Sequence, residues 1–488
     1  MREDKAKQLQ QLLARLSGRQ ASALALGIET ERALGQETLP SQTILDALRP
    51  QLRHTRAKRV PTLCRLACSM FEDFLSDRRD DPRRPGLIAR AAIDPWWRAL
   101  QHIAGAEIQE FEAELKQLVA NNDESGIAVL AESMARAARG WTEGVLAQLE
   151  KRRGDPVLKR LFPDPLLLID LREIARVLPL GSAVKESIDA VVRVAHQHGE
   201  AQGRQLADLG PETVTEAKHQ YLRLSDAFGL DARYFALGLL NKLDRAWAIL
   251  RLGRALSWKP NDSMVRDTEF GIIGERLIAD LQLQARDIVE LMQARDATHK
   301  MAQLRAWIAD YINDAEGLLG EFGFRRDSLW GEAILRTRAD IARAIDANLM
   351  RIGETVLAIL PQTTRASARR TLAVPDLTRV PDSATTAQAL DGARLLFFLV
   401  KHGQRHGFAV AARETVEHIG EEVERRSGQL LDEFRGAPQN PAIPAQIEAA
   451  KQVADILFED GRGDLLLRRL RNAQYAGQPR GGVYGLSG

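Results

Sequence analysis

The sequence predicts an all-α protein, in which tandem long helical hairpins form an elongated α-solenoid-like or multi-bundle array. The first observation is the stretch 231–292, where apolar residues recur at alternating spacings of three and four, as on one helix face. In its first half these residues are Ala236, Leu240, Leu243, Trp247 and Leu250. In its second half they are Phe270, Ile273, Leu277, Leu281, Ile288 and Leu291. Residues 259–263, KPNDS, predict the loop of this hairpin, because proline interrupts a helix and the following side chains can cap one.

Two further observations support this fold class. The stretch 328–360 predicts one very long helix, because aliphatic residues recur in it at near-heptad spacing. They are Ile334, Ile341, Ile345, Leu349, Ile352, Val356 and Ile359. No run shows a convincing alternation of β-branched residues, and aromatic residues make up only 5% of the chain, which fits a helical protein without a sheet.

The breaks between helices predict the domain organisation. Residues 1–60 form an N-terminal helical segment with a basic stretch, 61–210 a helical domain, and 211–360 a central domain of long helical hairpins. Residues 361–386 are the best linker, because they hold prolines at 361, 375 and 381 and many serines and threonines. Residues 387–475 form C-terminal hairpins, and the glycine-rich stretch 476–488 is a disordered tail. No tetratricopeptide, ankyrin or HEAT consensus fits the irregular spacing.

Composition narrows the functional classes. Charged residues make up 27% of the chain but nearly cancel, at a formal net charge of +2, so the whole molecule is not a nucleic-acid polycation. The sequence has only two cysteines and no pattern of a secretory leader. No apolar run approaches the length of ~18 residues that a membrane span needs. These features predict a cytoplasmic protein without a transmembrane segment. Abundant arginine and alanine suggest a bacterial source.

The most one-sided charge run lies in residues 49–65, with no acidic residue between Asp46 and Glu72. Its candidate binding residues are Arg49, Arg53, Arg56, Lys58 and Arg59, followed by Arg65. One interpretation is a site for phosphates of nucleic acid or anionic lipid. The alternative, which we favour at this point, is a solvated loop whose arginines pair with acids elsewhere, such as those at positions 73, 77 and 80.

Trp96 and Trp97 are the other candidate binding residues. They follow Asp94 and Pro95, a cap and a first-turn proline that predict a helix start. Adjacent helical residues point about 100° apart, so the two indoles cannot both face one core, and one could anchor a partner. The alternative is that neighbouring helices cover both, which is usual for large aromatic residues.

Signals for catalysis or metal binding are weak. His402 and His406 lie four apart, but the neighbouring glycines favour surface histidines at a turn over paired metal ligands. Cys64 and Cys68 lie in an apolar pattern and are expected to be small buried residues. Phosphate-loop, dinucleotide-binding, nucleophile-elbow, zinc-protease and kinase signatures are absent from the sequence. We therefore predict no catalytic residue, metal or cofactor.

These observations favour a non-enzymatic cytoplasmic scaffold or adaptor that binds another protein between helical hairpins. A second hypothesis is a protein that binds nucleic acid or an anionic membrane through the 49–65 stretch. A third is an enzyme of unrecognised type with an interhelical pocket. A homo-oligomer could form through the aliphatic face of 328–360, although packing of that face within the chain is favoured because Arg338 interrupts it.

Overall fold

The computed structural model describes residues 13, 16–33, 44–45, 47–48, 60–77, 84–121, 123–151, 154–203, 205–256, 270–321, 328–367, 370–404 and 406–476. In these residues α-helices dominate and the strands form only two-stranded ladders, which confirms the all-α prediction. The chain divides into two compact units. Unit 1 comprises residues 1–78 and 87–186, and unit 2 comprises 79–86 and 187–488. The solenoid-like arrangement stays a prediction.

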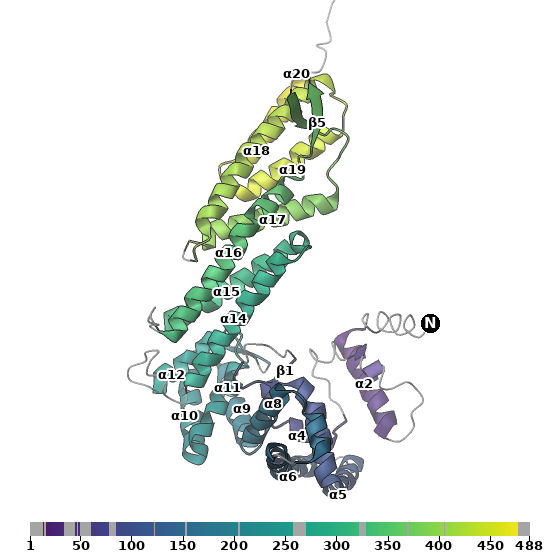
Figure 1. Cartoon of the computed structure of the whole chain (residues 1–488), viewed down its shortest axis with the longest axis vertical. Helices are drawn as coiled ribbons and strands as arrows, with labels where there is room; N and C mark the ends of the chain where they lie inside the picture. Colours follow the sequence, from purple (N-terminus) through teal and green to yellow (C-terminus); the bar gives the residue numbers. More distant parts are fainter. Residues whose placement is uncertain are drawn as a thin grey trace, which may run out of the picture. The chain divides into compact units, whose positions relative to one another are not determined.

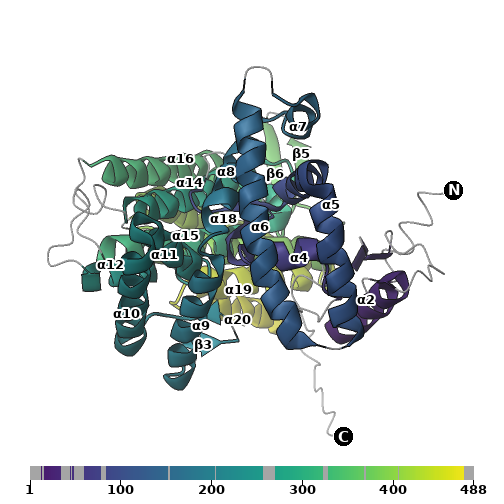
Figure 2. The same ribbon diagram turned by 90° about the horizontal axis from the view of Figure 1, so that it is seen from below.

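Unit 1 is built on the antiparallel pair α5 and α6, which lie side by side (Figure 1, Figure 2). The turn between them lies between Ala120 and Glu124, and Asp123 caps α6 by accepting a hydrogen bond from the Gly126 amide at 2.8 Å. Short helices α4 and α8 pack against α6. The helices of this unit are α2 (Gly18–Ala33), α4 (Leu63–Cys68), α5 (Ile93–Ala120), α6 (Glu124–Glu150), α7 (Pro156–Leu161), α8 (Pro165–Val177) and the start of α9 (Gly181–Gln197).

Unit 2 contains the longer helices, and α16 is central to it, packed against α14, α17 and α18 (Figure 1). All seven aliphatic residues of the predicted 328–360 helix are buried in the chain. The helix begins as predicted, because the Ser328 hydroxyl accepts a hydrogen bond from the Gly331 amide at 3.1 Å. The helices are α10 (Pro211–Phe228), α11 (Arg233–Leu240), α12 (Leu250–Leu256), α14 (Gly271–Gln293), α15 (Met301–Glu321), α16 (Leu329–Leu357), α17 (Ser383–His402), α18 (Ala409–Gly436), α19 (Ala442–Leu457) and α20 (Arg462–Ala476).

Short 3₁₀-helices and strands connect these helices. The 3₁₀-helices are η1 (Glu72–Phe74), η2 (Arg90–Ala92), η3 (Gly229–Ala232), η4 (Ala246–Ile249) and η5 (Ala297–Lys300). β1 (Leu75–Ser76) and β2 (Ile88–Ala89) pair in parallel, and β3 (Ala201–Gln202) and β4 (Gln205–Leu206) are antiparallel.

The first half of the 231–292 hairpin is not one helix, so that part of the prediction was wrong. α11 ends at Leu240, and the chain turns before η4 and α12. In the turn, the Leu206 amide donates to the Lys242 carbonyl at 2.7 Å, and the Asp244 amide donates to the Leu206 carbonyl at 2.8 Å. These long-range bonds replace the helical ones that a continuous helix would need. The five predicted apolar residues are nevertheless all buried, and the second half forms α14. The predicted 259–263 loop lies outside the described residues.

The segment 361–386 contains an antiparallel hairpin, where the sequence predicts a linker without strands. β5 (Gln362–Ser367) pairs with β6 (Arg370–Pro375), and α17 begins at Ser383. The sequence did not indicate this pairing. The strands hold small polar residues and few large apolar ones, so they lack the alternation that marks a strand in a sequence. This segment lies within unit 2.

A buried arginine explains why residues 84–86 belong to unit 2. Arg276 of α14 is 5% exposed, and its guanidinium donates to the Pro85 carbonyl at 3.3 Å, to Asn241 Oδ1 at 3.1 Å and to Asp280 Oδ2 at 2.9 Å. Burial lowers the pKa of Arg276, and the carboxylate of Asp280 opposes that effect. A buried charge requires such partners, so this contact fixes the segment on α11 and α14.

Helices of the described part of the chain are all either too short or too polar for a membrane crossing.

Candidate functional site

The basic stretch cannot be placed. Arg49, Arg53, Arg56, Lys58 and Arg59 all lie outside the described residues. The next basic residue, Arg65, forms an ion pair with Glu29 of α2 at 2.6 Å and donates to the Val60 carbonyl at 2.7 Å. Arg65 therefore joins α2 to α4. Its carboxylate partner is Glu29 and not one of the acids at positions 73, 77 and 80 that the sequence suggested.

The two adjacent tryptophans lie in different environments. Trp96 is fully buried, its Nε1 donates to Thr142 Oγ1 of α6 at 2.9 Å, and its ring meets Phe71 edge-on at a centroid distance of 5.4 Å. Trp97 is half-buried, with its ring 6.1 Å from that of Trp96. Trp96 is thus a core residue, and an anchoring role for Trp97 stays a prediction.

The two histidines of the 401–407 turn also differ. His402 is exposed and stacks on Phe398 at a centroid distance of 4.7 Å. His406 is buried, with Nε2 3.4 Å from the Glu316 carboxylate of α15, so its expected surface position was wrong. The next residue, Gly407, has a positive φ of 89°, a backbone conformation that favours glycine. Among the residues that the structure describes, no group of three or more His, Cys, Asp and Glu is arranged to hold a metal ion.

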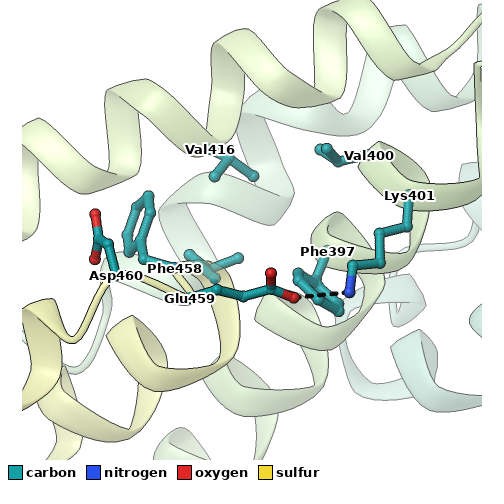
Figure 3. Close-up of a pocket in the computed structure, with 8 residues that line it drawn as sticks. Phe397, Val400, Lys401, Val416, Phe458, Glu459 and Asp460 are labelled. Atoms are coloured by element: carbon teal, nitrogen blue, oxygen red, sulfur yellow. Dashed lines mark hydrogen bonds and ion pairs between the residues drawn. The ribbon is translucent and has the colours of Figure 1, made fainter.

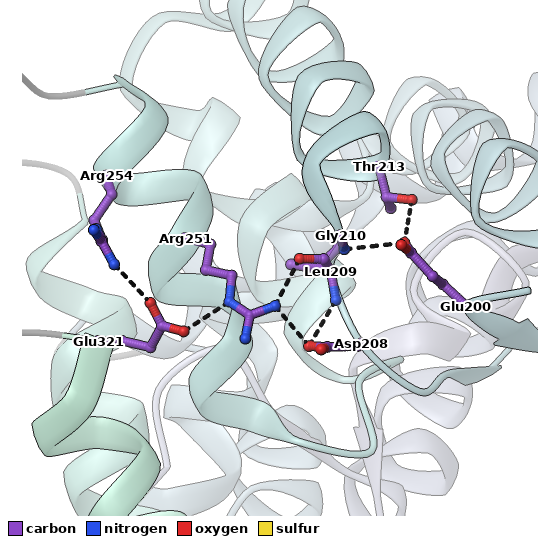
Figure 4. A network of polar contacts seen from close by, with 8 residues as sticks. All are labelled: Glu200, Asp208, Leu209, Gly210, Thr213, Arg251, Arg254 and Glu321. Carbon is purple, nitrogen blue, oxygen red and sulfur yellow. Dashed lines mark hydrogen bonds and ion pairs between the residues drawn. The ribbon is translucent and has the colours of Figure 1, made fainter. Parts of the chain in front are cut away.

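A network of charged side chains joins α12 to α15 and to the start of α10 (Figure 4). Arg251 donates to Glu321 at 2.7 Å, to Asp208 at 2.9 Å and to the Leu209 carbonyl at 2.8 Å. Arg254 donates to the same Glu321 at 3.0 Å. Burial lowers the pKa of Arg251, but hydrogen bonds with Glu321 and Asp208 outweigh that effect and raise it. Because its charged groups pair with one another, this network holds α12, α15 and the start of α10 together.

A second polar cluster joins α18 to the end of α16. Glu422 accepts hydrogen bonds from Arg425 at 2.8 Å and from Arg426 at 2.8 Å. Arg426 also donates to the Leu360 carbonyl at 3.1 Å, just after α16 ends. The hydrogen bonds from Arg425, together with those from Arg426, lower the pKa of Glu422 to about 2. This cluster is structural as well, because each charge already has a partner.

The candidate site is an open groove of about 490 Å³ formed where α17 and α19 end beside α18 (Figure 3). Its walls are mostly apolar: Phe397, Val400, Val416, Leu457 and Phe458. Val416 and Leu457 form the buried floor, whereas the two phenylalanines and Val400 are half-buried. The structure therefore keeps large apolar side chains accessible to an incoming ligand.

The charged residues of the groove are already paired. The Lys401 ammonium lies 2.8 Å from the Glu459 carboxylate and 4.3 Å from the centroid of the Phe397 ring (Figure 3). Asp460 accepts from the Arg462 guanidinium at 2.7 Å, and that guanidinium lies 4.5 Å from the centroid of the Phe458 ring. These exposed pairs leave little net charge at the rim, so the groove suits an apolar group better than an ion.

Phe458 also separates this groove from a smaller hollow between α18 and α20, which the side chains of Val423, Leu465 and Leu466 line. Gly420 of α18 makes room for the ring, since a Cβ there would lie 2.8 Å from Phe458 Cζ. The apolar surface therefore continues from the end of α17 to α20, with Leu465 itself 48% exposed.

The groove was not predicted from the sequence. A signal was available in the run 395–400, LLFFLV, because six consecutive apolar residues cover every face of a helix and only part of them can face one neighbour. Phe458 and its neighbours carry no comparable signal, since they reach the groove only through packing of the last four helices.

Comparisons of the chain with protein-family models, with curated proteins and with solved structures found no match.

Proposed function

We propose that this protein is a non-enzymatic helical scaffold or adaptor of the bacterial cytoplasm, and that a partner protein binds in the groove lined by Phe397, Val400 and Phe458. The observation that supports this proposal is the accessible apolar lining of the groove, which the helices α17, α18 and α19 carry. Its volume of about 490 Å³ falls within the ~300–1,000 Å³ typical of ligand pockets, enough for a few apolar side chains.

The groove favours an amphipathic helix as the bound segment. Its floor and walls are apolar and its rim is charged, which matches the apolar stripe and polar back of such a helix. Phe397 and Phe458 supply the aromatic anchors that dominate binding energy at many interfaces. Because Lys401 and Glu459 already neutralise one another, a strongly charged partner segment would gain little here.

Site-specific photo-crosslinking tests this proposal. A photoreactive amino acid replaces Val400 in the full chain, and native cells are irradiated before purification in low and high salt. The matched control carries the same amino acid at Met350 of α16, which is 75% exposed but lies outside the groove. We expect one protein to be crosslinked from position 400 in both salts. Equal crosslinking from the two positions, or none from position 400, would contradict the proposal.

A second candidate function is electrostatic binding of nucleic acid or an anionic membrane through the basic 49–65 stretch. It is supported by the charge run itself, six cations without an intervening acid. Reversal of Arg53, Arg56 and Lys58 to glutamate is expected to abolish binding to duplex DNA or to anionic vesicles, and wild-type binding is expected to fall steeply with salt. Reversal of Arg343, whose side chain is 77% exposed, is the control. Binding that ignores both charge reversal and salt would exclude this function.

A further inference from the structure

Lys401 covers one of the two aromatic rings of the groove. It lies in the last turn of α17, four residues after Phe397, and its ammonium is 4.3 Å from the centroid of the Phe397 ring (Figure 3). Residues at this spacing are neighbours on a helix surface, so the aliphatic part of the lysine can lie along the ring while the ammonium stays in water. The lysine therefore shields apolar surface that the groove would otherwise present.

Glu459 holds the lysine in this position from the opposite wall of the groove. It belongs to the turn between α19 and α20, and its carboxylate accepts a hydrogen bond from Lys401 Nζ at 2.8 Å (Figure 3). An ammonium on a flexible four-carbon chain has many other positions available in solvent. The ion pair reduces that freedom and joins the end of α17 to the turn.

The second aromatic ring is covered in a different way. The Arg462 guanidinium lies 4.5 Å from the centroid of the Phe458 ring and donates to Asp460 Oδ2 at 2.7 Å. The backbone amide of Arg462 also donates to Asp460 Oδ1 at 3.2 Å. Ring, cation and carboxylate thus all belong to residues 458–462, whereas the pair that covers the other ring crosses the groove.

We infer that the Lys401–Glu459 pair is a latch that controls access to the groove; this inference rests on the proposed function, in which a partner protein binds there. With the latch closed, Lys401 lies over Phe397. When the pair breaks, the lysine turns into solvent and the face of the ring becomes available to the apolar stripe of a partner helix. The two side chains are 51% and 74% exposed, so the latch opens by side-chain rotation and needs no movement of the backbone.

The strength of the two contacts sets the size of the effect. An exposed ion pair and an exposed cation–aromatic contact are each weak, so we expect an open latch to strengthen binding of an apolar molecule by about fivefold. Salt screens exposed charges. Binding in the groove should therefore become tighter as salt is added, which is the opposite of binding driven by attraction between charges.

Nile red, a neutral apolar dye, tests the latch on the full-length protein. A dye is preferable to a thiol label, because Cys64 and Cys68 on α4 are half-buried, not buried as expected, and would also take up the label. Glu459→Lys replaces attraction to Lys401 by repulsion. This variant should bind the dye about fivefold more tightly than the wild type.

Two further variants identify the cause of the gain. Glu143→Lys is the matched control, because it breaks an exposed ion pair with Arg139 on α6, outside the groove, and should bind the dye as the wild type does. Phe397→Ala removes the ring that the latch covers. In this background Glu459→Lys should no longer increase the affinity for the dye.

Salt provides a readout that needs no new variant. The affinity of the wild type for Nile red should rise from low to high salt more than that of Glu459→Lys, whose latch is already open. Equal affinities of the wild type and Glu459→Lys would overturn the inference, and so would a gain that persists in the Phe397→Ala background.

The dye and the photo-crosslinking from position 400 separate the latch from the proposed function. Unchanged dye binding in Glu459→Lys, together with a crosslinked partner, would count against the latch alone. The expected gain in dye binding without a crosslinked partner would count against the proposed partner protein.

Discussion

Gly274 of α14 lies against the indole of Trp330, which stands at the start of α16. A Cβ at Gly274 would lie 2.1 Å from Cη2, 2.3 Å from Cζ2 and 2.7 Å from Cζ3 of this ring. Nonbonded carbon atoms prefer separations of about 3.5–4.0 Å, so the ring or the helix must retreat by about 1.5 Å. We therefore predict that Gly274→Ala destabilises unit 2 by forcing α14 and α16 apart or by displacing the indole.

Two opposing effects set the magnitude. Overpacking a well-packed core costs about 1–3 kcal/mol. Alanine in place of glycine within a helix regains about 1 kcal/mol. Trp330 is only 7% exposed, and its rigid ring has little room to move, so we place the overpacking cost in the upper half of its range. The expected net loss of unfolding free energy is about 1–2 kcal/mol.

Gly428→Ala is the matched control. It lies inside α18, and a Cβ there would meet no atom within 4 Å, so only the gain in helix propensity remains. We expect this variant to be about 0.5–1 kcal/mol more stable than the wild type. Urea denaturation followed by far-ultraviolet circular dichroism measures both variants.

A double-mutant cycle with Trp330→Leu identifies the contact responsible. If the indole causes the loss, Gly274→Ala should cost much less in the Trp330→Leu background, with a coupling energy of about 1–2 kcal/mol. A clash with the indole is excluded if the free-energy changes of Gly274→Ala and Trp330→Leu are additive. It is also excluded if Gly274→Ala stabilises the protein as much as Gly428→Ala does.

Two further predictions concern polar groups. Hydrogen bonds from Arg425 and Arg426 depress the pKa of Glu422 from 4.5 to about 2 in the folded protein, so they stabilise it above pH 4.5 and the stabilisation is lost as the pH falls toward 2. Glu422→Gln should therefore lower the unfolding free energy by about 1 kcal/mol at neutral pH, allowing for solvent screening, and urea titrations should show the difference shrinking below about pH 4.5. Thr142→Val should cost about 1–3 kcal/mol, because it leaves the buried Trp96 Nε1 without its acceptor. Thr142→Ser, which keeps the hydroxyl, should unfold at nearly the wild-type urea concentration.

Long helices with a regular apolar face could be predicted from the sequence. The predicted 328–360 helix is found as α16, which ends three residues earlier, at Leu357. Its aliphatic residues are buried as expected, because neighbouring helices cover the continuous apolar face. The cap of α6 is equally local, since Asp123 directly precedes the helix whose first turn it caps. These features depend on residues close in sequence, which is where periodicity is informative.

Features that depend on distant residues could not be predicted in this way. The break after Leu240 is stabilised by hydrogen bonds between the 242–244 backbone and Leu206, whereas the apolar residues on both sides of the break keep the spacing of one helix face. The β5–β6 hairpin is likewise formed from residues that read as a polar linker, and its strands pair with each other and contact α18. Tertiary hydrogen bonds therefore override the local pattern after Leu240, whereas the β5–β6 hairpin is a local pairing that the residue pattern does not indicate and that contacts with α18 support.

The groove shows how the same packing that forms the core also creates a candidate site. α17 is in contact with α15, α16, α18 and α19, and these neighbours bury Leu395, Leu396 and Leu399. Phe397 and Val400 lie between the buried positions, about 100° away from their chain neighbours, and remain half-buried where α17 and α19 end. Because the sequence places phenylalanine and valine there, apolar surface stays accessible at the groove, and the proposed apolar partner would gain free energy by burying it.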